Sequence, residues 1–261
     1  MDNWRGKWAL VTGASAGIGT ALARELAAGG TNLVLTARRR ERLESLAASL
    51  RSTDVRVEIV VADLASPQAP QAIYDFVAAK NIPIELLVNN AGFGGYGELH
   101  QQPAQRLLDM VQVNCTAVVH LTRLFLPAMV ERRSGDILIL ASTASFQAVP
   151  YISTYAATKA FDLLFAEGLA EEAKPYGIRV CSLCPGSTTS EFHEVAGQAH
   201  LAAERKQESA EKVARTGLQA LAAGKSYVIS GLGNYLGAQS QRLVPRRMVT
   251  KIAAKMFRPK K

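Results

Sequence analysis

The chain has 261 residues, of which 48% are hydrophobic and 20% are charged, a composition that is ordinary for a globular protein with a large buried core. No apolar run approaches the roughly 20 residues that span a bilayer, and the start "MDNWRGKWALVTG" lacks the layout of a secretion signal, so we expect a cytoplasmic protein. The formal net charge is +8, but eight of the 30 basic residues follow Asn234 with no acidic residue among them, and the other 22 balance the 22 acidic ones. The excess charge therefore belongs to a tail and does not indicate a nucleic-acid-binding body.

Seven short apolar runs rich in Val, Leu and Ile alternate with longer helical patterns. The runs are "WALVTG", "NLVLTA", "VRVEIVVAD", "IELLVNN", "GDILILAS", "IRVCSLC" and "SYVIS", and the helical patterns cover 17–28, 40–51, 67–80, 103–131, 151–174 and 209–223. This alternation predicts an α/β fold of the Rossmann type, a doubly wound, seven-stranded parallel sheet with helices on both faces. Nothing divides the series early, so we expect one domain over 1–233 and a basic tail over 234–261.

A glycine-rich segment, "TGASAGIG", follows the first predicted strand and opens the first helix. Gly13, Gly17 and Gly19 would allow the backbone to turn tightly and approach a pyrophosphate, which the free amides and dipole of the helix N-terminus stabilise. In the first βα unit of such a sheet, this pattern predicts a dinucleotide site.

The residues after the second strand indicate which dinucleotide binds. A free ribose 2'-hydroxyl favours an acidic residue about 20 positions beyond the glycines, but Ala37 stands there and Arg38 follows it. A guanidinium at this place suits a 2'-phosphate, which predicts NADP. The alternative is that Arg38, Arg39 and Arg40 form only the solvated start of a helix.

Polar and small residues follow two later strands at their carboxyl ends, the edge where ligands bind in such sheets. Asp63 and Leu64 lie in "VADLAS", and "NNAG" covers 89–92. Asp63 could also cap the next helix, and the two roles are compatible.

"YAATK" places Tyr155 and Lys159 four residues apart, on one face of a predicted helix. A free tyrosine has a pKa of about 10, so it works near neutral pH only beside a group that favours its ionised form. Lys159 would supply that charge.

The chain resembles the short-chain dehydrogenase/reductase family, in its single-domain branch. The resemblance covers Lys7 to about Gly231 and rests on motifs in family order: "TGASAGIG", the Asp63–Leu64 pair, "NNAG", "VQVN", "ILILAS", "YAATK" and "PGSTTS". It implies cofactor contacts from Gly13, Ser15, Gly17, Ile18, Gly19, Arg38, Asp63, Leu64, Asn90, Ala91, Gly92, Tyr155, Lys159, Pro185, Gly186 and Thr188.

The resemblance also implies a catalytic set of Asn114, Ser142, Tyr155 and Lys159. Tyr155 would be the general acid in reduction and the general base in oxidation, while Lys159 also holds the ribose hydroxyls. Ser142 would position the same substrate oxygen. Asn114 matches the family asparagine that binds a water linking the lysine to solvent, and as a purely structural residue it would satisfy a kinked backbone.

Several residues surround the expected site. Pro185 and Gly186 resemble the nicotinamide-carboxamide loop, with Thr188 donating from its backbone; Ser190 stands where many members have threonine. The aromatic residues expected in the loops around the nicotinamide suggest an apolar, bulky carbonyl substrate: Phe93, Tyr96, Phe146, Tyr151 and Phe192. Tyr151 has no lysine four residues on and is interpreted as a pocket wall. Residues 190–209 are interpreted as a lid or, alternatively, a fixed helical insertion.

The three cysteines, Cys115, Cys181 and Cys184, show no metal-ligand pattern and are expected to be buried small hydrophobes, so no metal is predicted. In the tail, apolar side chains recur at steps of four beside basic ones, which predicts a basic amphipathic helix that contacts an anionic membrane or a neighbouring subunit. The apolar stripe is Val244, Met248, Ile252 and Met256, and the basic residues are Arg247, Lys251, Lys255 and Arg258.

These features predict an NADP(H)-dependent oxidoreductase that interconverts a carbonyl and an alcohol on an apolar or lipid-like small molecule. The resemblance further implies a homodimer or homotetramer. The alternatives are a cofactor-binding, membrane- or partner-associated protein with a vestigial site, and an epimerase or enoyl reductase of the same family.

Overall fold

Seven strands form one parallel sheet in the order β3-β2-β1-β4-β5-β6-β7. The computed structural model describes residues 2–51, 55–198 and 207–259. The strands are β1 (Trp8–Thr12), β2 (Asn32–Ala37), β3 (Val57–Val61), β4 (Ile84–Asn89), β5 (Gly135–Leu140), β6 (Ile178–Cys184) and β7 (Tyr227–Ile229). The predicted fold class is confirmed, and each apolar run contains one strand. The order reverses between β1 and β4, which is where such sheets bind ligands.

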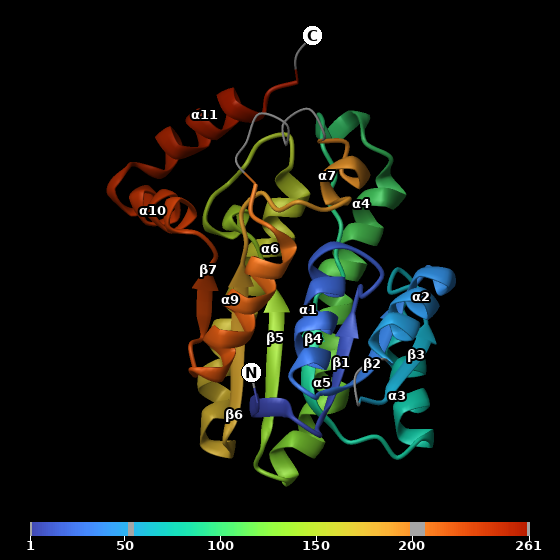
Figure 1. Ribbon diagram of the computed structural model, residues 1–261. Helices are drawn as coiled ribbons and strands as arrows, with labels where there is room; N and C mark the ends of the chain where they lie inside the picture. Colours follow the sequence, from blue (N-terminus) through green and yellow to red (C-terminus); the bar gives the residue numbers. More distant parts are fainter. Residues whose placement is uncertain (1, 52–54, 199–206, 260–261) are drawn as a thin grey trace.

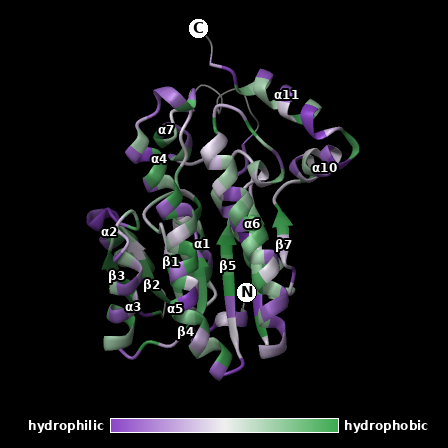
Figure 2. Cartoon of the chain, turned by 180° about the vertical axis from the view of Figure 1, so that it is seen from behind, coloured by the Kyte–Doolittle hydropathy of each residue, from purple (hydrophilic) through white to green (hydrophobic). Residues whose placement is uncertain are grey.

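Helices cover both faces of the sheet (Figure 1). On one face α1 (Gly17–Ala28), α2 (Arg40–Leu50) and α9 (Ala210–Ala222) share a core with the strands. On the other face α3 (Ala69–Ala79), α5 (Ala117–Glu131) and α6 (Ser153–Ala173) form a second core. The strands need no alternation of polar and apolar residues because both of their faces are buried. Figure 2 shows this pattern as hydrophobic strands between helices of mixed character.

The long helix expected over 103–131 is interrupted. It consists of α4 (Ala104–Val111), a π-helical turn (Gln112–Thr116) and α5. A π turn adds a residue to the helix, and such turns are frequent at functional sites. The combined helix, Ala104–Glu131, is long and apolar enough to cross a membrane by length and composition alone, but buried core helices meet the same criterion, and α5 belongs to the second core.

The N-terminal segment is attached to the amino edge of the sheet. Trp4, in a short 3-10 helix (Asp2–Trp4), is 1% exposed and donates from Nε1 to Asp136 Oδ2 at 2.7 Å. Arg179 also binds Asp136, through Nε at 2.6 Å and Nη2 at 2.8 Å. The buried carboxylate of Asp136 therefore joins the start of the chain to β5 and β6.

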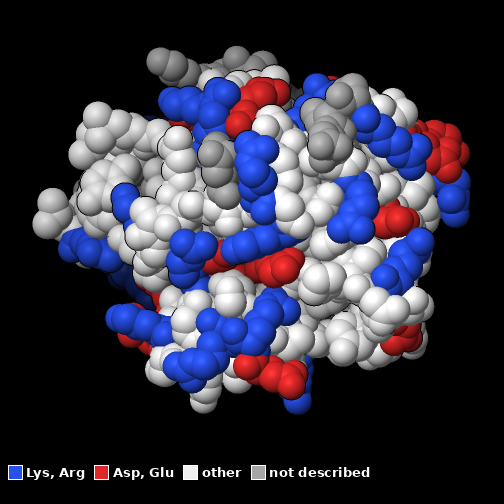
Figure 3. Space-filling view, turned by 60° about the horizontal axis from the view of Figure 1, so that its bottom comes forward, with Lys and Arg blue, Asp and Glu red and all other residues white. Residues whose placement is uncertain are grey.

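The surface at this end of the molecule carries scattered Lys and Arg side chains with Asp and Glu among them (Figure 3).

Three further helices lie beyond the carboxyl ends of the strands: α7 (Phe192–Val195), α10 (Leu232–Ser240) and α11 (Arg246–Phe257). Ala253 and Phe257 of α11 are buried in a cluster with Met110, Val149 and Tyr155. The tail thus packs on the body of the protein at the edge where the site was expected.

Candidate active site

A large cavity opens at the carboxyl edge of the sheet. Its volume is about 1010 Å³, whereas sites for drug-sized ligands measure about 300–1,000 Å³, so it has room for a dinucleotide. The loops after β1 to β6 line it from one side, and α7, α10 and α11 line it from the other.

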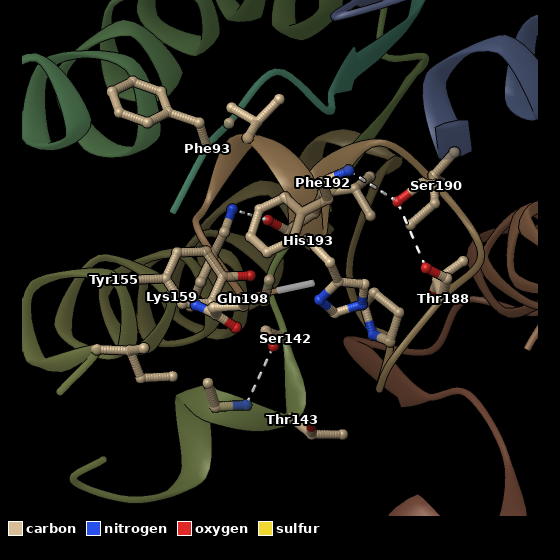
Figure 4. A pocket seen from close by; sticks show the side chains of 18 of the residues that line it. Phe93, Ser142, Thr143, Tyr155, Lys159, Thr188, Ser190, Phe192, His193 and Gln198 are labelled. Carbon is tan, nitrogen blue, oxygen red and sulfur yellow. Dashed lines mark hydrogen bonds between the residues drawn. The ribbon is translucent and has the colours of Figure 1, made fainter. Parts of the chain in front are cut away.

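Tyr155 and Ser142 face this cavity together (Figure 4). Tyr155 lies in the first turns of α6 and is 9% exposed. Ser142 follows β5, and its Oγ accepts a hydrogen bond from Ala144 N at 3.1 Å, which caps the 3-10 helix Thr143–Phe146. Burial raises the pKa of Tyr155 above 10.0, although Lys159 and a hydrogen bond from Ser142 both act to lower it. The expected influence of Lys159 is present, but burial outweighs it.

Lys159 lines the same cavity and is 5% exposed. Its Nζ donates to Leu140 O at 2.6 Å and to Asp162 Oδ2 at 2.9 Å. Asp162 lies three residues further along α6 and is completely buried. The lysine is thus held by a carboxylate that the sequence analysis did not include in the site.

Asn114 lies in the π turn and is completely buried. Its Nδ2 donates to Phe93 O at 3.0 Å and to Thr158 Oγ1 at 2.9 Å, and its Oδ1 accepts from Phe93 N at 3.1 Å. The side chain joins the loop after β4 to α6 behind the cavity wall. This geometry matches the structural role that was considered for Asn114, and the water-binding role stays a prediction.

The glycine segment forms the expected turn between β1 and α1. Gly13 has a φ of +65°, and a Cβ there would lie 2.8 Å from Asn90 Nδ2 and 2.9 Å from Ala91 Cα. Asn90 fixes the turn, because its Nδ2 donates to Thr12 O at 2.7 Å. Gly19 lies behind the cavity lining, and a Cβ there would be 2.3 Å from Gly13 O. The turn therefore leaves its backbone open to a ligand, as a dinucleotide requires.

Two arginines stand at the end of β2, and they differ in their contacts. Arg38, the predicted ligand of the 2'-phosphate, lines the cavity and is exposed. Arg39 turns towards the glycine segment and donates from Nη2 to Ser15 Oγ at 3.3 Å. Arg39 also binds Glu191 at 2.8 Å, and Arg42 binds the same carboxylate. Arg42 and Arg39 together lower the pKa of Glu191. Sequence reasoning missed Arg39 as a member of the site.

The other predicted cofactor residues also reach the cavity. Asp63 Oδ1 accepts from Ala65 N at 3.0 Å, so it stabilises the turn before α3 while it lines the cavity. The remaining members of the predicted set that line it are Ser15, Gly17, Ile18, Leu64, Asn90, Ala91, Gly92, Pro185, Gly186 and Thr188. Thr188 Oγ1 donates to Gly186 O at 3.1 Å, which closes the loop after β6.

The aromatic residues divide into two groups. Phe93 and Phe192 line the cavity, and the Phe192 ring packs on Tyr155 with centroids 5.3 Å apart. Tyr96, Phe146 and Tyr151 lie outside the lining. The interpretation of Tyr151 as a wall of the main cavity is therefore wrong: Tyr151 lines a separate small hollow with Gly97 and Glu98, among other residues. The Tyr151 side chain packs instead against the buried cluster that contains Met110, Val149 and Tyr155, and its backbone φ is +69°.

Helix α11 covers the cavity with apolar side chains. Ile252, Ala253, Met256 and Phe257 line it, and Tyr96 Oη donates to Phe257 O at 3.0 Å. The predicted apolar stripe is only partly buried, because Met248, Ile252 and Met256 remain 54%, 50% and 58% exposed. The stripe has one side at the cavity and the other at the surface.

Other expectations have mixed outcomes. Of the segment 190–209, residues 199–206 lie outside the described residues; His193 and Gln198 from its first part line the cavity. Cys181 and Cys184 are buried in β6, and Cys115 is half-buried. Burial raises the pKa of each thiol to about 12. Within the described ranges, no group of three or more His, Cys, Asp or Glu could hold a metal ion.

The known proteins that are similar in sequence are short-chain dehydrogenases and reductases. A family model for short chain dehydrogenase matches residues 7–216. Very-long-chain 3-oxoacyl-CoA reductase of Pyrenophora tritici-repentis is 36% identical over 182 residues, 67% of this chain and 53% of that protein. Hydroxysteroid dehydrogenase-like protein 1 of Gallus gallus is 38% identical over 184 residues, which are 69% of this chain and 55% of that protein. The match spans about half the length of these curated relatives.

Solved structures are similar over almost the whole chain. A short-chain dehydrogenase from Sphingobium yanoikuyae in complex with NADPH has a TM-score of 0.82 and 32% identity, covering 91% of this chain and 94% of the other. The bulky-bulky ketone specific alcohol dehydrogenase from Comamonas testosteroni has a TM-score of 0.78 and 28% identity, with coverage of 91% and 92%. A short-chain dehydrogenase/reductase from Burkholderia phymatum in complex with NAD has a TM-score of 0.85 and 25% identity, with coverage of 93% and 95%.

The fold and the cavity define a Rossmann-type protein with a site of the size of a dinucleotide. The chain belongs to the short-chain dehydrogenase family.

Proposed function

We propose that this protein is an NADP(H)-dependent oxidoreductase that interconverts a carbonyl and an alcohol. The observation that carries the proposal is that Tyr155 and Ser142 present their hydroxyls to one cavity, with Lys159 beside them. A single oxygen atom of a substrate can meet both hydroxyls there, which is the requirement for proton transfer to a carbonyl.

The cofactor fits residues of this chain. The open turn at Gly13 and the N-terminus of α1 suit a diphosphate, and Arg38 and Arg39 beside Ser15 suit a 2'-phosphate. Asp63, Leu64 and Asn90 to Gly92 would contact the adenosine side, and Pro185, Gly186 and Thr188 the nicotinamide side. NADPH would supply the hydride in reduction, and NADP would accept it in oxidation.

The protein's own groups handle the proton. In reduction Tyr155 Oη gives its proton to the carbonyl oxygen, and in oxidation it takes the proton from the alcohol. Ser142 Oγ holds that oxygen in place, while the ammonium of Lys159 favours the phenolate that remains after donation. Asn114 is proposed to bind a water that links Lys159 to solvent.

An apolar, lipid-like ketone is the proposed substrate. Phe93, Phe192 and the apolar side chains of α11 give the cavity wall its character, and hydrocarbon surface in such a wall favours apolar ligands. The names of two relatives, a very-long-chain 3-oxoacyl-CoA reductase and a bulky-bulky ketone specific alcohol dehydrogenase, support this class.

The tail is proposed to contact an anionic membrane surface from the cytoplasmic side. Met248, Ile252 and Met256 are half exposed next to the exposed Lys251 and Lys255, an arrangement that suits an interfacial helix. In this proposal residues 1–233 are one catalytic domain, and the tail over 234–261 contributes α11, which completes the cavity. A subunit contact in a homodimer or homotetramer is the competing use of this surface.

A panel of ketones with NADPH absorbance as the readout tests the function. Tyr155→Phe should lower ketone reduction at least about 100-fold, the lower end of what general acid catalysis contributes, while NADPH fluorescence shows that cofactor binding is retained. Tyr151→Phe is the matched control and should turn over normally, because Tyr151 lies outside the cavity lining. Unimpaired turnover in Tyr155→Phe would show that Tyr155 does not transfer the proton. Cofactor binding without turnover of any ketone favours a vestigial site, an epimerase or an enoyl reductase.

A further inference from the structure

Asp162 is a buried carboxylate to which the reaction assigns no task. It is 0% exposed, and its Oδ2 accepts from Lys159 Nζ at 2.9 Å. Its Oδ1 has no hydrogen-bond partner among the described residues. Burying such a group is costly even when it is paired, and apolar residues of similar volume often serve stability better. A carboxylate at this position therefore lowers the stability of the fold, which points to a role in the site.

The pair brings opposite charges together beside Tyr155. The side chains of Lys159 and Asp162 are 6% and 1% exposed, so water screens neither of them well. Besides Asp162, Lys159 Nζ has one hydrogen-bond acceptor among the described residues, the carbonyl oxygen of Leu140. The positive charge of Lys159 next to Tyr155 is therefore accompanied by the negative charge of Asp162, which is hydrogen-bonded to the lysine.

We propose that Asp162 is a positioning residue that tunes the acidity of Tyr155 through Lys159: its carboxylate offsets the charge of Lys159 and withholds part of the stabilisation that Lys159 alone would give to the phenolate. The proposal rests on the proposed function, in which Tyr155 donates a proton in carbonyl reduction and accepts one in alcohol oxidation. In that step the Tyr155 O–H bond breaks, its proton goes to the carbonyl oxygen, and the hydride from NADPH goes to the carbonyl carbon.

The charges around Tyr155 act on its pKa in the direction that this geometry requires. Burial raises the pKa of Tyr155. Lys159 and Ser142 act to lower that pKa, and Asp162 acts to raise it. Burial lowers the pKa of Lys159, but Asp162, Tyr155 and Cys115 raise it, so that the pKa lies above 10.5. Burial also raises the pKa of Asp162 from 3.8 to about 6. The contact between Lys159 and Asp162 thus favours the charged form of each side chain, against the effect of burial.

The test is the ionisation of Tyr155 in the free protein, followed by tyrosinate absorbance after a rapid pH jump. The chain has seven tyrosines, so the Tyr155 titration is the difference between each protein and its Tyr155→Phe counterpart. We expect a wild-type midpoint above 10.0. In Asp162→Asn the midpoint should fall below the wild-type value, as expected when the charge of a neighbouring lysine is no longer offset.

Two variants control this measurement. Asp162→Glu keeps the charge and should restore a midpoint near the wild-type value. Cys115→Ser alters another neighbour of Lys159. Burial raises the pKa of the Cys115 thiol to about 12, so this variant should leave the midpoint of Tyr155 unchanged. The pH at which alcohol oxidation reaches half its maximum should fall in Asp162→Asn with the phenol midpoint, because only oxidation needs the phenolate.

An unchanged midpoint in folded Asp162→Asn overturns the proposal. If that variant does not fold, Asp162→Ala takes its place, and an unchanged midpoint in that variant overturns the proposal equally. The proposed function fails separately, through ketone turnover that survives in Tyr155→Phe, and the absorbance titration does not depend on turnover.

Discussion

At the scale of the residue, Arg38 and Arg39 illustrate how neighbours in sequence diverge in structure. The chemistry of the pair indicates a 2'-phosphate, but the sequence does not reveal which guanidinium turns towards the glycine segment. Arg39 reaches Ser15 Oγ and Glu191, whereas Arg38 is exposed at the cavity. The difference comes from the helix start, because Arg39 is the extended residue before α2 and its side chain points back across the sheet edge.

Arg39→Ala should raise the KM for NADPH about 10-fold and leave the KM for NADH near its original value. The reason is that a charge-assisted hydrogen bond to a phosphate contributes about 1.5–3 kcal/mol, and only NADPH carries the 2'-phosphate. Initial rates with both cofactors measure this. Arg40→Ala, which removes an exposed arginine paired with Glu44, is the matched control. An equal change for the two cofactors would contradict this role.

Asp162 shows a different limit of residue-level reasoning. Its spacing from Lys159, three residues along a helix, indicates that the two side chains can meet. The same spacing occurs on exposed faces of helices, and the sequence does not show that this face is buried. Burial is decided by how α6 packs on β5 and the π turn, which is a property of the assembled fold.

At the scale of the element, the turn between β1 and α1 is the part of the site that sequence predicts best. Its conformation is dictated locally: Gly13 has a positive φ, and a side chain there would strike Asn90 and Ala91. The interrupted helix was predicted less well. Hydrophobic periodicity indicates the span 103–131, but the π turn at Gln112–Thr116 is a short interruption inside that span, and the apolar pattern alone does not distinguish it from α-helix. That turn carries Asn114, so the missed detail lies at the site.

Gly13→Ala should lower the free energy of unfolding by more than about 1 kcal/mol, since alanine is strained at positive φ, and it should weaken NADPH binding because the turn must move. Gly168→Ala is the control: Gly168 lies within α6 with nothing within 4 Å of an added Cβ, so this change should stabilise the protein by about 0.5–1 kcal/mol. Urea unfolding and NADPH fluorescence measure both effects. Normal cofactor affinity in Gly13→Ala would remove the turn from the binding site.

At the scale of the whole molecule, the sheet and its covering helices followed from the alternation of apolar runs and helical patterns. The placement of the tail did not follow. Its sequence indicates an amphipathic helix and nothing about where that helix packs, because the surface that receives Ala253 and Phe257 is assembled from Met110, Val149 and Tyr155, residues far away in the chain. The tail was therefore expected as an appendage, and the structure brings it onto the cavity.

The double variant Lys251→Glu/Lys255→Glu should reduce co-sedimentation with anionic vesicles at least about 30-fold, given about 1 kcal/mol for each basic residue near such a surface. The same charge change at Arg24 and Arg123, exposed residues of α1 and α5, should have a much smaller effect. Vesicles of zwitterionic lipid provide the baseline. If vesicle binding is absent in the wild type and the tail variant instead changes the oligomeric state in gel filtration, the surface is a subunit contact.

The two sides of the cavity come from separate parts of the chain. Asn114, Ser142, Tyr155 and Lys159 belong to the middle, whereas α7, α10 and α11 lie after β6 and supply the cover. Under the proposed function, substitutions in the covering helices would therefore change which ketone fits without altering the atoms that move the proton. Such a division allows natural selection, or a protein engineer who exchanges these helices with those of a relative, to vary substrate range while the chemistry is inherited unchanged.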